Sequence, residues 1–108
     1  MTIKQGETYP PFSATLTDAA GAAVDLTGAA VTLRMSDAYG GNVIDDAAMT
    51  ITDAAAGKVE REWLETETDT PGVFFAEIWV ELDGARTPYP NQSHIIVEIL
   101  PAVAAGGT

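Results

Sequence analysis

Short segments in which apolar and polar residues alternate recur along this chain, and clusters of turn-forming residues separate them. Residues 12–17 place Phe12, Ala14 and Leu16 in one register, and residues 30–36 do the same with Val31 and Leu33. Successive side chains of a β-strand point to opposite faces of a sheet. The pattern therefore predicts strands with one buried face.

The same pattern predicts further strands of differing strength. Residues 42–45, 48–52 and 58–63 are weaker candidates, whereas residues 73–82 form the longest alternating run. Asp83-Gly84 follows this run, which is a tight-turn dipeptide, so residues 85–87 are expected to begin the return strand of a hairpin. Residues 93–100 are apolar in both registers, which is typical of a central strand covered on both faces.

Turn signals about 8–12 residues apart are typical of an all-β sandwich or barrel. Two alanine-rich stretches, residues 19–23 and 54–56, have helix propensity, but each is short and bounded by Asp and Gly, so turns are expected there. We expect one β-sandwich domain over residues 1–100, in which residues 1–11 form an extended N-terminal arm. Residues 101–108 carry no charge and are expected to form a flexible tail.

The charge of the chain narrows the range of partners. Five Lys and Arg residues against 16 Asp and Glu residues give a formal net charge of -11. Phosphates and anionic lipids should repel such a protein, so neither a nucleic acid nor a membrane is expected as a partner. No apolar run approaches the roughly 20 residues that span a bilayer. The first residues lack the hydrophobic segment of a secretory signal, so synthesis in a cytoplasm is expected.

Residues that could carry chemistry do not converge in the sequence. Cysteine is absent, and Asp45 and Asp46 are adjacent, so on a strand they would face opposite ways. His94 is the one histidine and has no acidic or nucleophilic partner at a recognisable spacing. Three further aspartates lie in turn clusters and are expected to cap those turns, namely Asp18, Asp37 and Asp53. We therefore predict no catalytic, cofactor or metal site and no enzymatic activity.

Two surface features are candidates for partner binding. An acidic run from Glu60 to Asp69 is either a solvated face or a patch that steers a basic partner. In the strand of residues 73–82, the register opposite the core carries Phe75, Glu77 and Trp79. Outward aromatic residues beside charged ones are typical of protein contact surfaces. The alternative is that a loop or the N-terminal segment covers Phe75 and Trp79.

The N-terminal segment has two alternative roles. Pro10-Pro11 fixes two backbone angles and removes two donors, so this stretch is expected to be extended. Thr2, Ile3 and Lys4 could then seal an edge of their own sandwich or pair with the sheet edge of a neighbouring subunit.

The order of these motifs resembles a known family. Residues 5–11 (QGETYPP), residues 14–18 (ATLTD) and residues 24–31 (VDLTGAAV) resemble the opening of the immunoglobulin-like domain of the phage baseplate upper protein family. Residues 53–59 (DAAAGKV), Trp63, residues 69–72 (DTPG) and Pro90-Asn91 agree in order and spacing, so the resemblance covers residues 4–100.

The resemblance implies an immunoglobulin-like antiparallel β-sandwich of about seven to eight strands. It also implies a non-enzymatic structural protein of a tailed-phage virion, which is assembled in the cytoplasm of the bacterial host. Several symmetric copies would attach to other virion proteins in the baseplate or tail. Two alternatives are a capsid decoration protein and a surface module that binds host glycans, with Trp79, Phe75 and Tyr89 stacking on sugar rings. An accessory domain of an enzyme is a third alternative.

Overall fold

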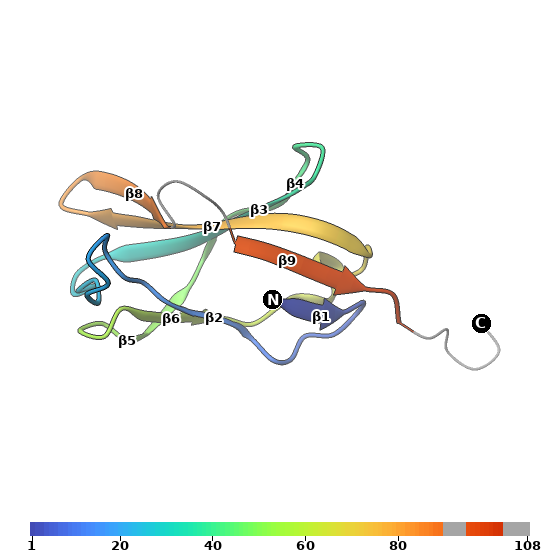
Figure 1. Cartoon of the computed structure of the whole chain (residues 1–108), viewed down its shortest axis with the longest axis horizontal. Helices are drawn as coiled ribbons and strands as arrows, with labels where there is room; N and C mark the ends of the chain where they lie inside the picture. Colours follow the sequence, from blue (N-terminus) through green and yellow to red (C-terminus); the bar gives the residue numbers. More distant parts are fainter. Residues whose placement is uncertain (90–94, 103–108) are drawn as a thin grey trace.

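The computed structural model describes residues 1–89 and 95–102 and shows an almost purely β chain. Its strands, in chain order, are β1 (Thr2–Lys4), β2 (Phe12–Thr15), β3 (Ala30–Asp37), β4 (Asn42–Ala48), β5 (Thr50–Asp53), β6 (Lys58–Arg61), β7 (Gly72–Leu82), β8 (Ala85–Tyr89) and β9 (Ile95–Leu100). One short 3-10 helix, η1 (Glu65–Glu67), precedes β7. Figure 1 shows the strands in two layers.

The larger layer is a six-stranded sheet in the order β1-β9-β7-β3-β4, with β8 paired to β7. The smaller layer is a three-stranded sheet in the order β2-β6-β5. The order β9-β7-β3-β4 matches the G-F-C-C′ strands of an immunoglobulin domain, and β2-β6-β5 matches its B-E-D strands. The predicted all-β, immunoglobulin-like sandwich is thus confirmed.

Alternation along the strands builds the core between the two sheets. In β7, Phe74, Ala76, Ile78 and Val80 are buried, as the sequence predicted for this register. The largest fully buried side chains come from several elements and include Leu26, Leu33, Met35, Ile78 and Ile99. Burial of these apolar side chains is the main stabilising contribution to the fold.

The structure refines the predicted strand pattern in two ways. The described residues contain nine strands rather than about seven to eight, because residues 2–4 of the predicted N-terminal arm form the additional strand β1. The pairing is also not wholly antiparallel, since β1 runs parallel to β9 with Ile3 opposite Ile99.

Turns replace helices at both alanine-rich stretches, as expected. The carboxylate of Asp18 accepts the backbone N–H groups of Ala20 and Ala22 at 2.9 and 3.0 Å. That of Asp53 accepts the N–H group of Ala56 at 3.2 Å, and in a further turn that of Asp37 accepts the N–H groups of Tyr39 and Gly41, both at 2.8 Å. Each aspartate satisfies backbone donors that the turn leaves unpaired, which is the role the sequence predicted.

Candidate interaction surface

The outer face of the six-stranded sheet carries the residues that the sequence singled out on β7. Phe75, Glu77 and Trp79 all lie in the register opposite the core and are half-buried. Phe75 and Trp79 are four residues apart, which corresponds to roughly 13 Å along a strand. Neighbouring strands supply different surroundings at these two positions, so the face has two distinct ends.

At the first end, two arginines cover Trp79. The guanidinium carbon of Arg34 in β3 lies 4.9 Å from the centroid of the Trp79 ring, and that of Arg86 in β8 lies 5.2 Å away. These distances are within the range of cation–π attraction. Strands β3 and β8 pair with β7 on its two sides, so both cations reach Trp79 from flanking strands. We call this group, with Asp46 and Glu81, the Trp79 cluster.

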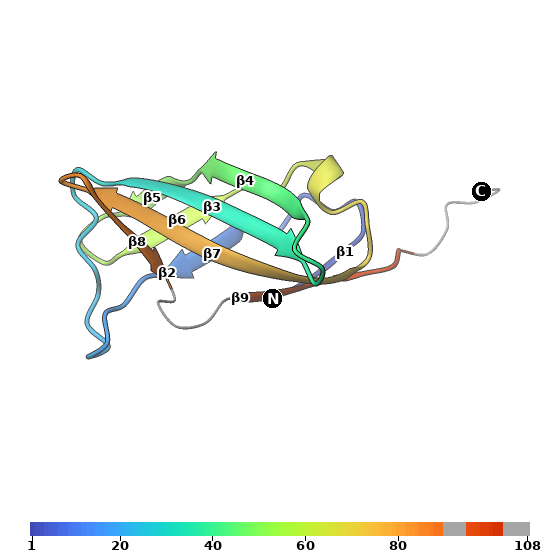
Figure 2. The same cartoon turned by 90° about the horizontal axis from the view of Figure 1, so that it is seen from above.

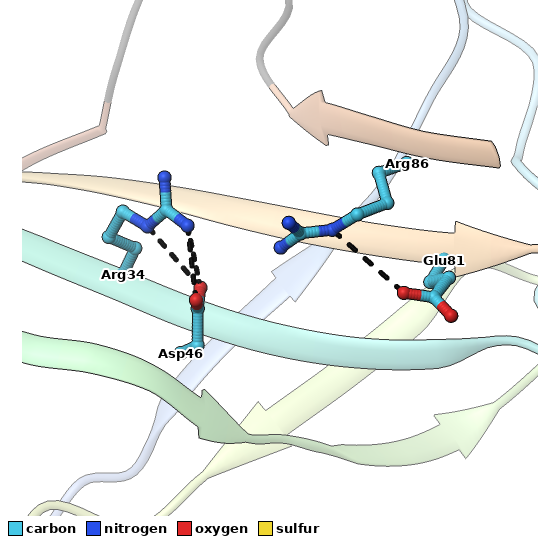
Figure 3. Close-up of polar contacts among 4 residues, drawn as sticks. All are labelled: Arg34, Asp46, Glu81 and Arg86. Carbon is cyan, nitrogen blue, oxygen red and sulfur yellow. Dashed lines mark hydrogen bonds and ion pairs between the residues drawn. The ribbon is translucent and has the colours of Figure 1, made fainter. Parts of the chain in front are cut away.

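Carboxylates hold both arginines in place (Figure 3). Arg34 donates from Nη2 to both carboxylate oxygens of Asp46 at 3.0 and 3.1 Å, and from Nε at 3.3 Å. A register shift between β3 and β4 and the positive φ of 50° at Asp46 accompany this contact. The hydrogen bonds to Asp46 raise the pKa of Arg34 above its ordinary value, although partial burial opposes the shift. Arg86 pairs more loosely with Glu81, at 3.9 Å.

Trp79 is therefore covered by side chains of its own chain. The sequence left open whether a partner, a loop or the N-terminal segment would cover it, and the structure shows arginines from β3 and β8 instead. No signal in the sequence pairs Arg34 or Arg86 with Trp79, because their contact depends on the order of strands in the sheet.

At the second end, aliphatic side chains gather around Phe75. Ile96 in β9 lies directly opposite Phe75, and Val73 is diagonal to Ile96 across the same strand pair. Val73, Ile96 and Leu100 are 44%, 54% and 36% exposed. We call Val73, Phe75, Ile96 and Leu100 the β7–β9 apolar patch.

The patch corrects one prediction. The sequence indicated a final strand covered on both faces, yet the outer face of β9 exposes Ile96 and Leu100. Strand β9 is central, between β1 and β7, and its inner residues Val97 and Ile99 are buried. Its apolar outer register is left exposed because the three-stranded sheet packs only against the inner face.

The three aromatic residues proposed for sugar stacking do not form one platform. Tyr89 lies opposite Ile78, which is fully buried, and packs against the core. Paired residues share a face of the sheet, so Tyr89 points away from the face that carries Trp79 and Phe75. A groove of about 310 Å³ does open beside Phe75, and Arg34, Ser36, Asn42 and Glu77 line it.

The N-terminal residues seal an edge of their own sheet. Strand β1 pairs with β9, and the terminal amine of Met1 donates to the carbonyl of Ile96 at 2.9 Å. Ile3 is only 3% exposed, so its side chain belongs to the core and offers no surface to a partner. Thr2 and Lys4 are exposed on either side of it.

An acidic corner borders the β7–β9 apolar patch. Gln5 N–H donates to the carbonyl of Leu100 at 2.8 Å, and Gly6 N–H donates to that of Thr68 at 3.0 Å. These two hydrogen bonds bring the segment after β1, the end of β9 and the segment after η1 together. Four exposed carboxylates flank this junction and define the acidic corner: Glu7, Glu65, Asp69 and Glu98.

Neither a metal-binding group of side chains nor a membrane-spanning helix is found among the described residues. Over residues 1–89 and 95–102, no group of three or more His, Asp or Glu side chains is arranged to hold a metal ion. In the same part of the chain, no helix has the length and apolar character needed to cross a membrane. His94, Pro90 and Asn91 lie outside the described residues, as does most of the predicted tail.

Comparison with protein-family models and with curated protein sequences gives no match. The resemblance of residues 4–100 to the phage baseplate upper protein family stays a prediction from the sequence.

Proposed function

We propose that this protein is a non-enzymatic structural domain of a tailed-phage virion that attaches to other virion proteins through the outer face of its six-stranded sheet. The observation that carries the proposal is the β7–β9 apolar patch, in which Val73 and Ile96 are 44% and 54% exposed on the same face as Phe75. Contiguous exposed apolar side chains on a soluble domain typically mark a protein contact. The motif resemblance supports the choice of a virion as the setting.

The fold fits this role because a sandwich presents a rigid, pre-formed face. Eleven residues of β7 span the sheet and pair with β3 on one side and with β8 and β9 on the other. A face held in this way loses little conformational entropy on binding. Several symmetric copies in a particle would need only modest affinity each, since contacts within an assembly reinforce one another.

The test is incorporation into particles. Particles produced with a tagged wild-type chain should contain it in a fixed copy number, measured by quantitative mass spectrometry after gradient purification. A Val73→Ser/Ile96→Ser variant should be depleted at least tenfold while the isolated domain still melts cooperatively. Leu64→Ser is the matched control, because Leu64 is also exposed, at 58%, but precedes η1. Absence of the wild-type chain from particles would refute the proposal.

A further inference from the structure

The charges around the β7–β9 apolar patch indicate what kind of surface it binds. Resting on the function proposed above, we infer that the partner presents aliphatic side chains flanked by Lys or Arg, which seat on the patch and face the acidic corner. The Trp79 cluster, at the other end of the sheet face, lies outside this contact.

Carboxylates of the acidic corner come from β9 and from the segment after η1. Glu98 lies opposite Val73 in the β7–β9 pair, so its carboxylate is within the patch rather than beside it. Asp69 is tied to the same corner because its carbonyl accepts the side-chain N–H of Gln5 at 2.7 Å. The segment after η1 is joined to the segment after β1, because Gly6 N–H donates to the carbonyl of Thr68 at 3.0 Å, and Figure 2 shows the loop that leads from η1, which carries Glu65, to the start of β7. Glu98 is thus part of the patch surface, and Asp69 is held through Gln5 near the end of β9, where Leu100 belongs to the patch.

Few cations lie at this end of the sheet face. Arg61 donates to both carboxylate oxygens of Glu67, each at 2.7 Å, and the two side chains are only 13% and 10% exposed. This ion pair is closed to solvent and leaves the exposed carboxylates uncompensated. Among the described residues near this corner, the remaining cations are Lys4 and the terminal ammonium of Met1, which donates to the carbonyl of Ile96 at 2.9 Å.

A second copy of this chain is an unfavourable occupant of the patch. Each copy carries a formal charge of -11, so two acidic corners brought face to face would repel each other. Opposite charge on a partner both accelerates encounter and fixes orientation. A basic partner is therefore the occupant that the surface favours.

The experiment measures binding of the full chain to each structural protein encoded in the same phage genome, purified separately, by biolayer interferometry at 50 and 300 mM NaCl. For the protein that binds, Ile96→Ser should weaken the affinity at least about tenfold. Glu98→Gln combined with Asp69→Asn should slow association about threefold or more at 50 mM NaCl and flatten its salt dependence. Leu64→Ser and Glu60→Gln are the controls for polarity and charge, and both should bind as the wild type does.

Each other outcome decides against one proposal or both. Binding that ignores Ile96→Ser, or whose rate does not respond to salt and to Glu98→Gln with Asp69→Asn, overturns the inference but leaves the virion role intact. Light scattering that shows self-association dependent on Ile96 assigns the patch to a second copy and overturns it as well. A chain that is found in particles but binds none of their proteins also overturns the inference. A chain that is absent from particles overturns the proposed function.

Discussion

The two ends of the outer face of the six-stranded sheet show the same sequence pattern, an outward aromatic residue on β7, but the side chains around that residue differ. Phe75 and Trp79 occupy the same register of β7, on either side of Glu77. Trp79 has arginines from β3 and β8 within 4.9 and 5.2 Å of its ring, whereas Phe75 has Ile96 directly opposite. The cross-strand neighbours of an outward aromatic residue therefore decide whether its own chain covers it with charged side chains or leaves it beside exposed aliphatic ones.

The two ends of the sheet face therefore contribute differently to the free energy of the protein. In the Trp79 cluster each arginine has a carboxylate partner and lies over the indole ring, so both cations and the ring are covered within the chain, whereas the buried Nε1 of Trp79 has no hydrogen-bond partner among the described residues. In the β7–β9 apolar patch, aliphatic groups remain in contact with water, which costs free energy until another surface covers them. Substitutions at the first end should therefore affect folding, and substitutions at the second end should affect association.

The largest expected effect separates the two ends directly. Trp79→Ala removes a half-buried ring that two guanidinium groups contact, so it should lower the free energy of unfolding by about 2 kcal/mol. Val73→Ser removes an exposed side chain and should change it by less than about 0.5 kcal/mol. Urea denaturation followed by circular dichroism measures both. Equal midpoints for the two variants would mean that the ends do not differ as described.

Much of the fold followed from local signals in the sequence. The inward register of β7, the β7–β8 hairpin at Asp83-Gly84 and the turns capped by Asp18 and Asp37 were all predicted and are confirmed. Each depends on side chains within a few residues of one another, where alternation and turn preferences act.

The interaction surface was predicted only in part, because it depends on contacts between distant segments. Ile96 is in the outer register of β9, and only the strand order reveals that it lies beside Phe75 with no layer above it. The pairing of Arg34 with Asp46 requires a register shift in the β3–β4 pair that alternation does not signal. Likewise, parallel pairing of β1 with β9 joins residues from the two ends of the described chain.

A smaller expected effect is the coupling energy of each ion pair in the Trp79 cluster. A double-mutant cycle with Arg34→Ala and Asp46→Ala should give a coupling energy of about 0.5–1 kcal/mol, since the contact is forked and only partly exposed. The corresponding cycle for Arg86 and Glu81 should give less than about 0.3 kcal/mol, because the groups are 3.9 Å apart and at least half exposed. Chemical denaturation of the variants measures both couplings. A larger coupling for Arg86 would make β8, rather than β3, the main support of Trp79.

The smallest expected effect comes from the opposite side of the sandwich. The outer face of the three-stranded sheet carries short polar side chains, with Ser13 opposite Glu60 and Thr15 opposite Lys58. Thr15→Val with Thr52→Val would place apolar groups on that face, and the free energy of unfolding should change by less than about 0.5 kcal/mol, since both sites are exposed.

The same double variant tests whether apolar area alone makes a contact. When Thr15→Val and Thr52→Val are added to the Ile96→Ser chain, the affinity for the virion partner should stay as weak as in Ile96→Ser alone. The new apolar groups lie on the three-stranded sheet, whereas Glu98 lies on the six-stranded sheet. Interferometry measures the affinity. Recovery of binding would show that the partner requires only exposed apolar surface. The distinction between the two sheet faces, and with it the role of the acidic corner, would then be lost.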